Sequence, residues 1–279
     1  MLLGYNTNGL AHHDPIQAVE LLAAIGYKSI AITLDQGTLN PFSRDLAESI
    51  ATMRDALQRL EMRSVIETGA RFLLDPNVKH EPTLMSTDPD ARARRVDFLC
   101  RAIDIARELG SDCVSFWSGI LRDDADDRAA MQRLVESLRQ VIDYGAGQGS
   151  VLAFEPEPGM FIDTMAGYKR LLEHVDAPHF RLTLDVGHLH CQRETPIADY
   201  IRQWRTRIAN IHIEDMRAGV HEHLMFGEGE MDFPPIIEAL AGIGYEGGVH
   251  VELSRHSHVG PAAARRAFAF LQPLMTRET

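Results

Sequence analysis

Cysteine is scarce in this chain. Among its 279 residues the cysteines are Cys100, Cys113 and Cys191, and no two of them are spaced as in a CxxC motif. An odd number of cysteines at irregular spacing argues against a disulfide framework and against a cysteine-rich metal site. We therefore expect reduced thiols in a reducing compartment.

The sequence also lacks segments that would direct it to a membrane. It contains no run of 18 apolar residues, so we expect no membrane span. The first residues, Met1-Leu2-Leu3-Gly4-Tyr5, have neither the basic region nor the long apolar region of a signal peptide. A cytoplasmic location is the expectation that follows.

The sequence contains fewer basic than acidic residues. The chain has 28 lysines and arginines against 40 aspartates and glutamates, a net charge of -12 at pH 7. Such a chain repels phosphate backbones and anionic membrane surfaces, so we expect neither nucleic acid nor membrane as a partner. A small anionic substrate is not excluded, because a local pocket can differ in sign from the whole surface.

Short apolar runs alternate with helical patterns along the whole chain. The predicted strands are residues 2–5, 29–33, 64–67, 113–117, 151–155, 181–185, 208–213 and 248–253. The predicted helices are residues 15–25, 43–60, 88–109, 123–146, 163–175, 196–205, 234–241 and 261–274, with long loops at 68–87 and 214–233. Strict alternation over this length predicts the α/β class and a single (β/α)8 TIM barrel domain spanning residues 1–279.

A doubly wound open sheet is the alternative α/β architecture. It would usually carry a glycine-rich phosphate loop after the first strand, but Asn6-Thr7-Asn8-Gly9-Leu10 does not match GxGxxG. No linker or low-complexity stretch divides the chain. Both observations favour the barrel.

Four predicted strands end in a metal-binding type of side chain. The runs are Leu152-Ala153-Phe154-Glu155, Leu182-Thr183-Leu184-Asp185, Ile208-Ala209-Asn210-Ile211-His212 and Val249-His250-Val251-Glu252. The carboxyl ends of parallel strands share one rim of a barrel, so these ends should converge. A single strand-end carboxylate often only caps the next helix, but four in succession are harder to explain in that way.

Three carboxylates and one imidazole in one cavity would repel one another without a cation. A divalent ion removes that conflict. Oxygen-rich ligation with one imidazole suits Mn²⁺ or Mg²⁺ best, with Zn²⁺ and Co²⁺ as alternatives. We therefore expect one divalent metal, held by Glu155, Asp185, His212 and Glu252.

Several motifs resemble the xylose isomerase-like TIM barrel superfamily, which includes the sugar phosphate isomerases and epimerases and AP endonuclease family 2. They are Phe154-Glu155-Pro156-Glu157-Pro158-Gly159, Leu184-Asp185-Val186-Gly187-His188, Ile211-His212-Ile213-Glu214-Asp215, and Gly227-Glu228-Gly229 before Asp232-Phe233. The resemblance implies a barrel with the same four metal ligands. It also implies that Glu155 and Glu252 act as acid and base on opposite faces of the substrate, through a metal-stabilised cis-enediolate.

The resemblance implies three substrate-binding residues as well. His188 would contact a substrate oxygen, or bind metal when more than one ion is present; a capping or solvent-facing histidine is the alternative. Arg217 resembles a substrate-binding arginine, against the alternative of a solvated surface residue. Glu157 would hold substrate or support a ligand. Related epimerases carry another acid further along this loop, where this chain has Met160-Phe161, so specificity for a free ketohexose is not implied.

Other polar residues follow the same strand ends. His221 and His223 form an HxH pair that would bind a second metal, as in the nuclease branch, or belong to a polar lid. His256 and His258 follow the last strand, where barrels often bind anionic groups. Trp117 would form a wall for a sugar ring or belong to the core.

These features lead to one main hypothesis and two alternatives. The main hypothesis is a divalent-metal-dependent isomerase or epimerase of a small polyhydroxy substrate: a sugar, sugar acid or cyclitol, phosphorylated or not. An inosose-type dehydratase would use the same metal site. An endonuclease IV-like phosphodiesterase would need histidines after strands three and four, where this chain has Glu67-Thr68-Gly69 and Trp117-Ser118-Gly119. The resemblance also implies a homodimer or a homotetramer as the oligomeric state.

Overall fold

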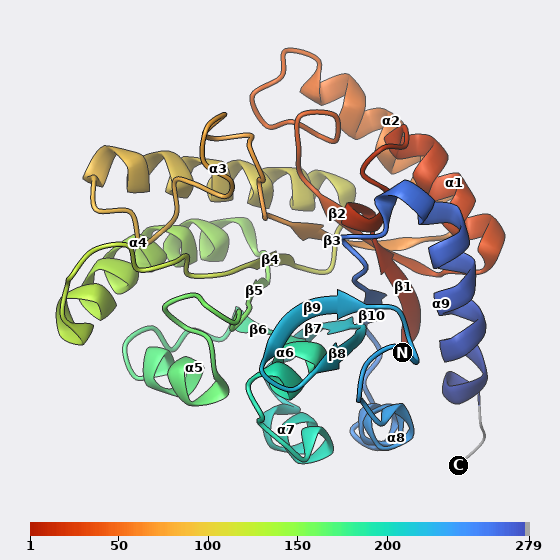
Figure 1. Ribbon diagram of the computed structural model, residues 1–279. Coiled ribbons are helices and arrows are strands. Elements are labelled where there is room, and N and C mark those ends of the chain that lie inside the picture. The colour runs from red at the N-terminus through yellow and green to blue at the C-terminus, as the bar shows by residue number, and fades with distance from the viewer. Residues whose placement is uncertain (277–279) are drawn as a thin grey trace.

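Eight parallel strands close into a barrel in the computed structural model, which describes residues 1–276 (Figure 1). Around the barrel the order is β1-β10-β7-β6-β5-β4-β3-β2. The barrel strands are β1 (Leu2–Asn6), β2 (Ser29–Thr33), β3 (Arg63–Glu67), β4 (Val114–Phe116), β5 (Leu152–Phe154), β6 (Phe180–Asp185), β7 (Ile208–Ile213) and β10 (Gly248–Val251). The predicted TIM barrel is confirmed. Residues 277–279, which the predicted domain included, lie outside the described residues.

Helices surround the strands (Figure 1). They are α1 (Pro15–Ile25), α2 (Leu46–Arg59), α3 (Pro89–Leu109), α4 (Asp127–Gln148), α5 (Met165–Leu172), α6 (Val186–Cys191), α7 (Ile197–Trp204), α8 (Phe233–Gly242) and α9 (Gly260–Met275), with 3-10 turns at Thr7–Leu10 and Ser257–Val259. No helix in the described part of the chain is both long and apolar enough to cross a membrane.

Local sequence determines where these helices begin and end. Asp14 caps α1, because its side chain accepts hydrogen bonds from the backbone N–H groups of Ile16 and Gln17, both at 3.0 Å. Gly26 ends the helix with a φ of 121°, a conformation that a side chain would strain. Gly110 ends α3 in a similar way, with a φ of 69°.

Three expectations about the connections were wrong. Between β6 and β7 the chain forms two helices, α6 and α7, so the alternation is not strict. The predicted loop at 214–233 contains an antiparallel hairpin, β8 (Asp215–Arg217) and β9 (Val220–Leu224), against which α6 packs. The helix predicted from residue 123 begins at Asp127. Elements of three to six residues are too short to show a clear periodicity, which explains the first two errors.

The inside of the barrel is polar below the carboxyl ends of the strands. Ser29, Thr183, Asn210 and His250 are all buried. The ring of His250 occupies space left by Gly248 of its own strand and Gly4 of the neighbouring strand β1. A Cβ on Gly248 would lie 2.2 Å from that ring, and one on Gly4 would lie 2.3 Å from it. A cluster of smaller apolar side chains (Ala31, Val65, Cys113 and Ala153) lies apart from the main core, which the strands share with the surrounding helices.

Candidate metal centre and active-site cavity

The four predicted metal ligands lie together at the carboxyl ends of β5, β6, β7 and β10. One ligand atom from each of Glu155, Asp185, His212 and Glu252 lies within 4.8 Å of the others. His212 Nδ1 is at the centre, 3.0 Å from Glu155 Oε1, 3.0 Å from Glu252 Oε2 and 4.0 Å from Asp185 Oδ2. Residues that are far apart in sequence meet here because parallel strands end on one rim.

The donor set at this centre fits a divalent cation. Asp185 Oδ2 is buried without a hydrogen-bond partner among the described residues. Burial raises the pKa of Glu155 to about 8, and the nearby carboxylates of Glu252 and Asp185 add to the shift. Burying an unpaired carboxylate costs free energy of folding, and a cation bound among these acids would stabilise their charged forms. Three carboxylates and an imidazole are ligands that Mn²⁺, Mg²⁺, Zn²⁺ and Co²⁺ accept.

A carboxylate that the sequence analysis did not select orients the histidine. Glu67 ends β3, and its Oε1 lies 2.9 Å from His212 Nε2. A carboxylate can only accept, so Nε2 donates to Glu67, and Nδ1 is the ring nitrogen that would coordinate a cation bound among the three acids. Metal-binding histidines commonly donate their other ring N–H to a carboxylate in this way. Glu67 had the same signal as the other acids, a carboxylate at a strand end.

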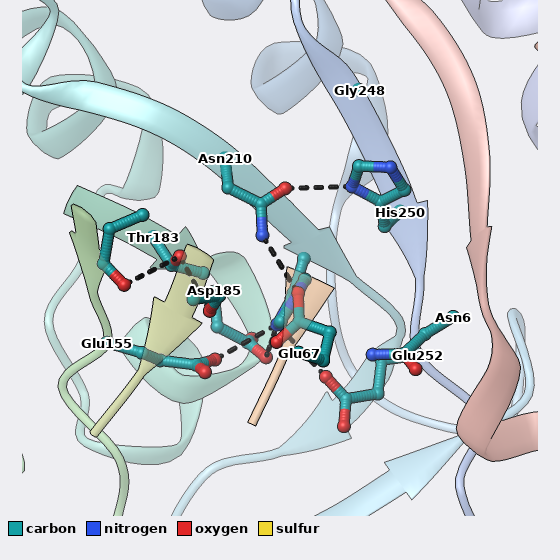
Figure 2. Close-up of polar contacts among 12 residues, drawn as sticks. Asn6, Glu67, Glu155, Thr183, Asp185, Asn210, Gly248, His250 and Glu252 are labelled. Carbon is teal, nitrogen blue, oxygen red and sulfur yellow. Dashed lines mark hydrogen bonds and ion pairs between the residues drawn. The ribbon is translucent and has the colours of Figure 1, made fainter. Parts of the chain in front are cut away.

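From Glu67 the hydrogen bonds continue into the barrel through Asn210 and His250 (Figure 2). The Asn210 amide donates to Glu67 Oε1 at 3.2 Å, and Asn210 Oδ1 accepts from His250 Nδ1 at 2.8 Å. Ser29 Oγ donates to His250 Nε2 at 2.8 Å. Burial lowers the pKa of His250 to about 3, so its ring is neutral and can donate at one nitrogen while accepting at the other. This chain of bonds fixes the orientation of Glu67.

The two candidate catalytic glutamates differ in proton affinity. Burial raises the pKa of both carboxyl groups, but for Glu252 the charge of His212 outweighs burial and lowers the pKa below its usual range. Asn8 also donates to Glu252 Oε1 at 2.8 Å. Carboxyl groups whose environments push their pKa values apart are what an acid and base pair requires.

A cavity of about 560 Å³ opens above these residues. Its wall includes Glu67, Glu155, Glu157, His212, Glu252 and Trp117. The Trp117 ring is held between two other groups: the Arg95 guanidinium lies 4.5 Å from its centre, and the His80 ring meets it edge-on at 5.6 Å. The volume falls in the usual range for small-molecule sites.

Residues 19–274 match the family model described as xylose isomerase-like TIM barrel. The chain belongs to this family.

Curated relatives in the family carry sugar epimerase names. The L-ribulose-5-phosphate 3-epimerase UlaE of Escherichia coli strain UTI89 is 21% identical over 250 residues, which are 89% of this chain and 85% of that protein. SgbU of Escherichia coli strain K12, named provisionally for the same activity, is 27% identical over 174 residues. That match spans 60% of this chain and 60% of the relative.

Solved structures of similar fold are also epimerases by name. The 3-keto-D-glucoside 4-epimerase YcjR of E. coli has a TM-score of 0.79 at 17% identity, covering 98% of this chain and 99% of that one. The D-psicose 3-epimerase of Clostridium cellulolyticum H10, solved with D-tagatose, has a TM-score of 0.78 at 20% identity, covering 99% of each chain. At these identities the likeness establishes the shared fold.

Two of the substrate-binding residues suggested by the family resemblance, His188 and Glu157, lie beside the candidate metal centre. His188 is buried on α6; its Nδ1 faces the Pro156 carbonyl at 3.2 Å, and its Nε2 lies 3.4 Å from Asp185 Oδ2. Glu157 Oε2 lies 4.0 Å from the same nitrogen. His221 Nε2 is 3.1 Å away from it, so His188 connects the metal centre with the hairpin.

Arg217 is not brought to the site. It ends β8, where its guanidinium donates to the Glu228 carbonyl at 2.9 Å, and it does not line the cavity. The prediction that Arg217 binds substrate therefore has no support from this geometry, because the hairpin places its side chain against another segment. Arg255, which follows β10, does line the cavity.

The histidine pair of the hairpin forms further clusters. His188, His221 and His223 offer ligand atoms within 4.8 Å of one another, and so do Asp185, Glu214 and His223. Glu214 was missed by the sequence analysis; it is fully buried, and neither of its oxygens has a hydrogen-bond partner among the described residues. A second metal at this position remains a proposal.

Proposed function

We propose that this protein is a divalent-metal-dependent epimerase or isomerase of a ketose-type polyhydroxy substrate. One observation carries the proposal: the carboxylates of Glu155, Asp185 and Glu252 lie around the imidazole of His212, each from a different strand end, beside a cavity of about 560 Å³. The epimerase names of the curated relatives support the same class of reaction.

Glu155, Asp185, His212 and Glu252 would hold the metal. When bound, the ion would polarise the substrate carbonyl and the adjacent hydroxyl, which makes the neighbouring C–H acidic. His188, which is buried beside Asp185, would contact a substrate oxygen. Glu157, which lines the cavity, would accept a hydrogen bond from a hydroxyl.

Glu155 and Glu252 are the candidates for moving the proton. One carboxylate removes the proton from the carbon next to the carbonyl, which leaves a cis-enediolate. The other, in its acid form, returns a proton to the opposite face and inverts that carbon. No electron leaves or enters the substrate, so no redox cofactor is required. In the reverse direction the two residues exchange roles.

The alternatives share parts of this chemistry. A dehydratase would begin with the same proton removal and then lose a hydroxyl as water. A phosphodiesterase would instead add water to phosphorus and would exchange no carbon-bound hydrogen. No feature of the residues in the described range favours either over epimerisation.

The test is turnover in deuterium oxide. The protein loaded with Mn²⁺ should epimerise or isomerise a member of a panel of ketoses, ketose phosphates and inososes, and solvent deuterium should enter the carbon next to the carbonyl. The Glu155→Gln variant should lose turnover while its circular dichroism spectrum is unchanged. Glu238→Gln, an exposed position on α8, is the matched control and should behave as wild type.

Two results would count against the proposal. Turnover that survives thorough chelation would exclude the metal. Turnover without deuterium entering the product would exclude proton removal from carbon.

A further inference from the structure

The cavity lining contains basic as well as acidic side chains. Beside the acids of the candidate metal centre, the loops after β3 and β10 contribute the cations Arg71, Lys79 and Arg255. His12, His80 and His258 also line the cavity. Strands β10, β1, β2 and β3 are consecutive around the barrel, so their loops form one continuous arc of the rim. A basic arc is unexpected in a chain whose net charge is -12.

The cations of this arc are only partly neutralised. Arg71 pairs with Asp35 at 3.1 Å and Arg255 with Glu222 at 3.2 Å, so each guanidinium keeps N–H groups for another acceptor. Lys79 has no ion pair in the part of the chain that the structure describes. The arc therefore has cationic donors that the protein itself does not use.

The pKa of His80 reflects both its burial and the charges of this arc. Its pKa is lowered to about 4, first by burial and then by the charges of Lys79, Arg95 and Arg71, each of which opposes protonation. Only its hydrogen bond to the Gly69 carbonyl acts in the other direction. An anion is the ligand that such a potential favours.

The loop after β3 is held in an uncommon backbone conformation. Arg71 and His80 have φ values of 32° and 70°, in the left-handed region that residues with side chains rarely adopt. The backbone N–H of His80 donates to the Arg71 carbonyl at 2.6 Å, and His80 Nδ1 donates to the Gly69 carbonyl at 2.6 Å. Strain of this kind persists only where the surroundings enforce it, and it is common at ligand sites. These two hydrogen bonds hold the loop that carries Arg71 and Lys79, both of which line the cavity.

We propose that Arg71, Lys79 and Arg255 bind an anionic group at the end of the substrate opposite the reacting carbonyl. The group is a phosphate ester or a carboxylate, since both present oxygens to cationic N–H donors. The metal would take the carbonyl end and the basic arc the other end, so the substrate spans the cavity in one orientation. The proposal rests on the proposed epimerase or isomerase function and assigns its substrate class.

The experiment compares a neutral ketopentose, its 5-phosphate and a ketohexuronate, all with the Mn²⁺-loaded protein. Wild type should have a higher kcat/KM for one of the anionic substrates, and which one distinguishes phosphate from carboxylate. Lys79→Met should raise KM for that substrate by about tenfold or more, with kcat and the neutral substrate little changed. Lys169→Met, an exposed position on α5, is the matched control and should change neither.

The outcomes separate the two proposals. Equal kcat/KM for neutral and anionic substrates would overturn the proposal that the basic arc binds an anionic group of the substrate. A Lys79→Met effect of equal size on both substrates would overturn it as well. In either case the proposed epimerase function would stand. If no substrate reacts, the binding of inorganic phosphate tests the site; it is followed by tryptophan fluorescence in a Trp204→Phe background, where Trp117 in the cavity wall is the remaining tryptophan. Binding that weakens about tenfold in Lys79→Met supports the site, and absence of binding overturns it.

Discussion

His212 Nε2 lies 2.9 Å from Glu67 Oε1, and this contact determines which ring nitrogen faces the metal centre. Nε2 donates a hydrogen bond to Glu67, so Nδ1, which lies 3.0 Å from both Glu155 and Glu252, is the nitrogen that would coordinate a metal held there. Asn210 holds Glu67 in turn. The ligand geometry at the rim therefore depends on a hydrogen-bond chain that extends into the barrel interior.

Glu67→Ala should weaken Mn²⁺ binding by about 10- to 100-fold, because His212 loses the partner that sets its tautomer. Glu67→Gln should recover part of that loss, since the amide oxygen can still accept from Nε2. Isothermal titration calorimetry of the metal measures both. Glu48→Ala, an exposed position on α2, should leave the affinity unchanged. A Glu67→Ala protein with wild-type affinity would show that the contact does not orient the ligand.

Metal analysis and thermal unfolding should respond together to chelation. We expect about one divalent ion per chain, and its removal should lower Tm, because a ligand at 100 times its Kd stabilises the native state by roughly 2.7 kcal/mol. Two ions per chain would support the second site at His188, His221 and His223, and His221→Ala should then return the count to one. A chain that retains no metal in Mn²⁺ buffer would contradict the candidate centre.

Gly248→Ala should destabilise the barrel, because the new Cβ would lie 2.2 Å from the buried ring of His250. Overpacking of this kind costs about 1–3 kcal/mol in free energy of unfolding. Gly147→Ala is the matched control: its Cβ would meet nothing within 4 Å on α4, and it should be neutral or stabilising. Urea denaturation of the two variants measures the difference. Equal stabilities would mean that the barrel interior can rearrange around His250.

Much of the fold could be predicted because its signals are local. A helix that opens at Asp14-Pro15 and closes at Gly26 follows capping rules that involve only neighbouring residues. Helix α6 and the hairpin β8–β9 could not be predicted, since they are short and are stabilised by packing against each other. Residues at strand ends could be assigned to one rim, because the topology of a barrel puts them there.

The sequence by itself determined the alternation of strands and helices and the residues that stand at the strand ends, because both depend on spacing along the chain. Only the tertiary structure decided that Glu67 and Asn210 support His212, that Arg217 donates to the Glu228 carbonyl and is not among the cavity-lining residues, and that Lys79 lines the cavity. The physical reason is that hydrogen bonds and charge pairing act over a few ångströms in space. Closure of the barrel sets those distances, and no spacing in the sequence encodes them locally.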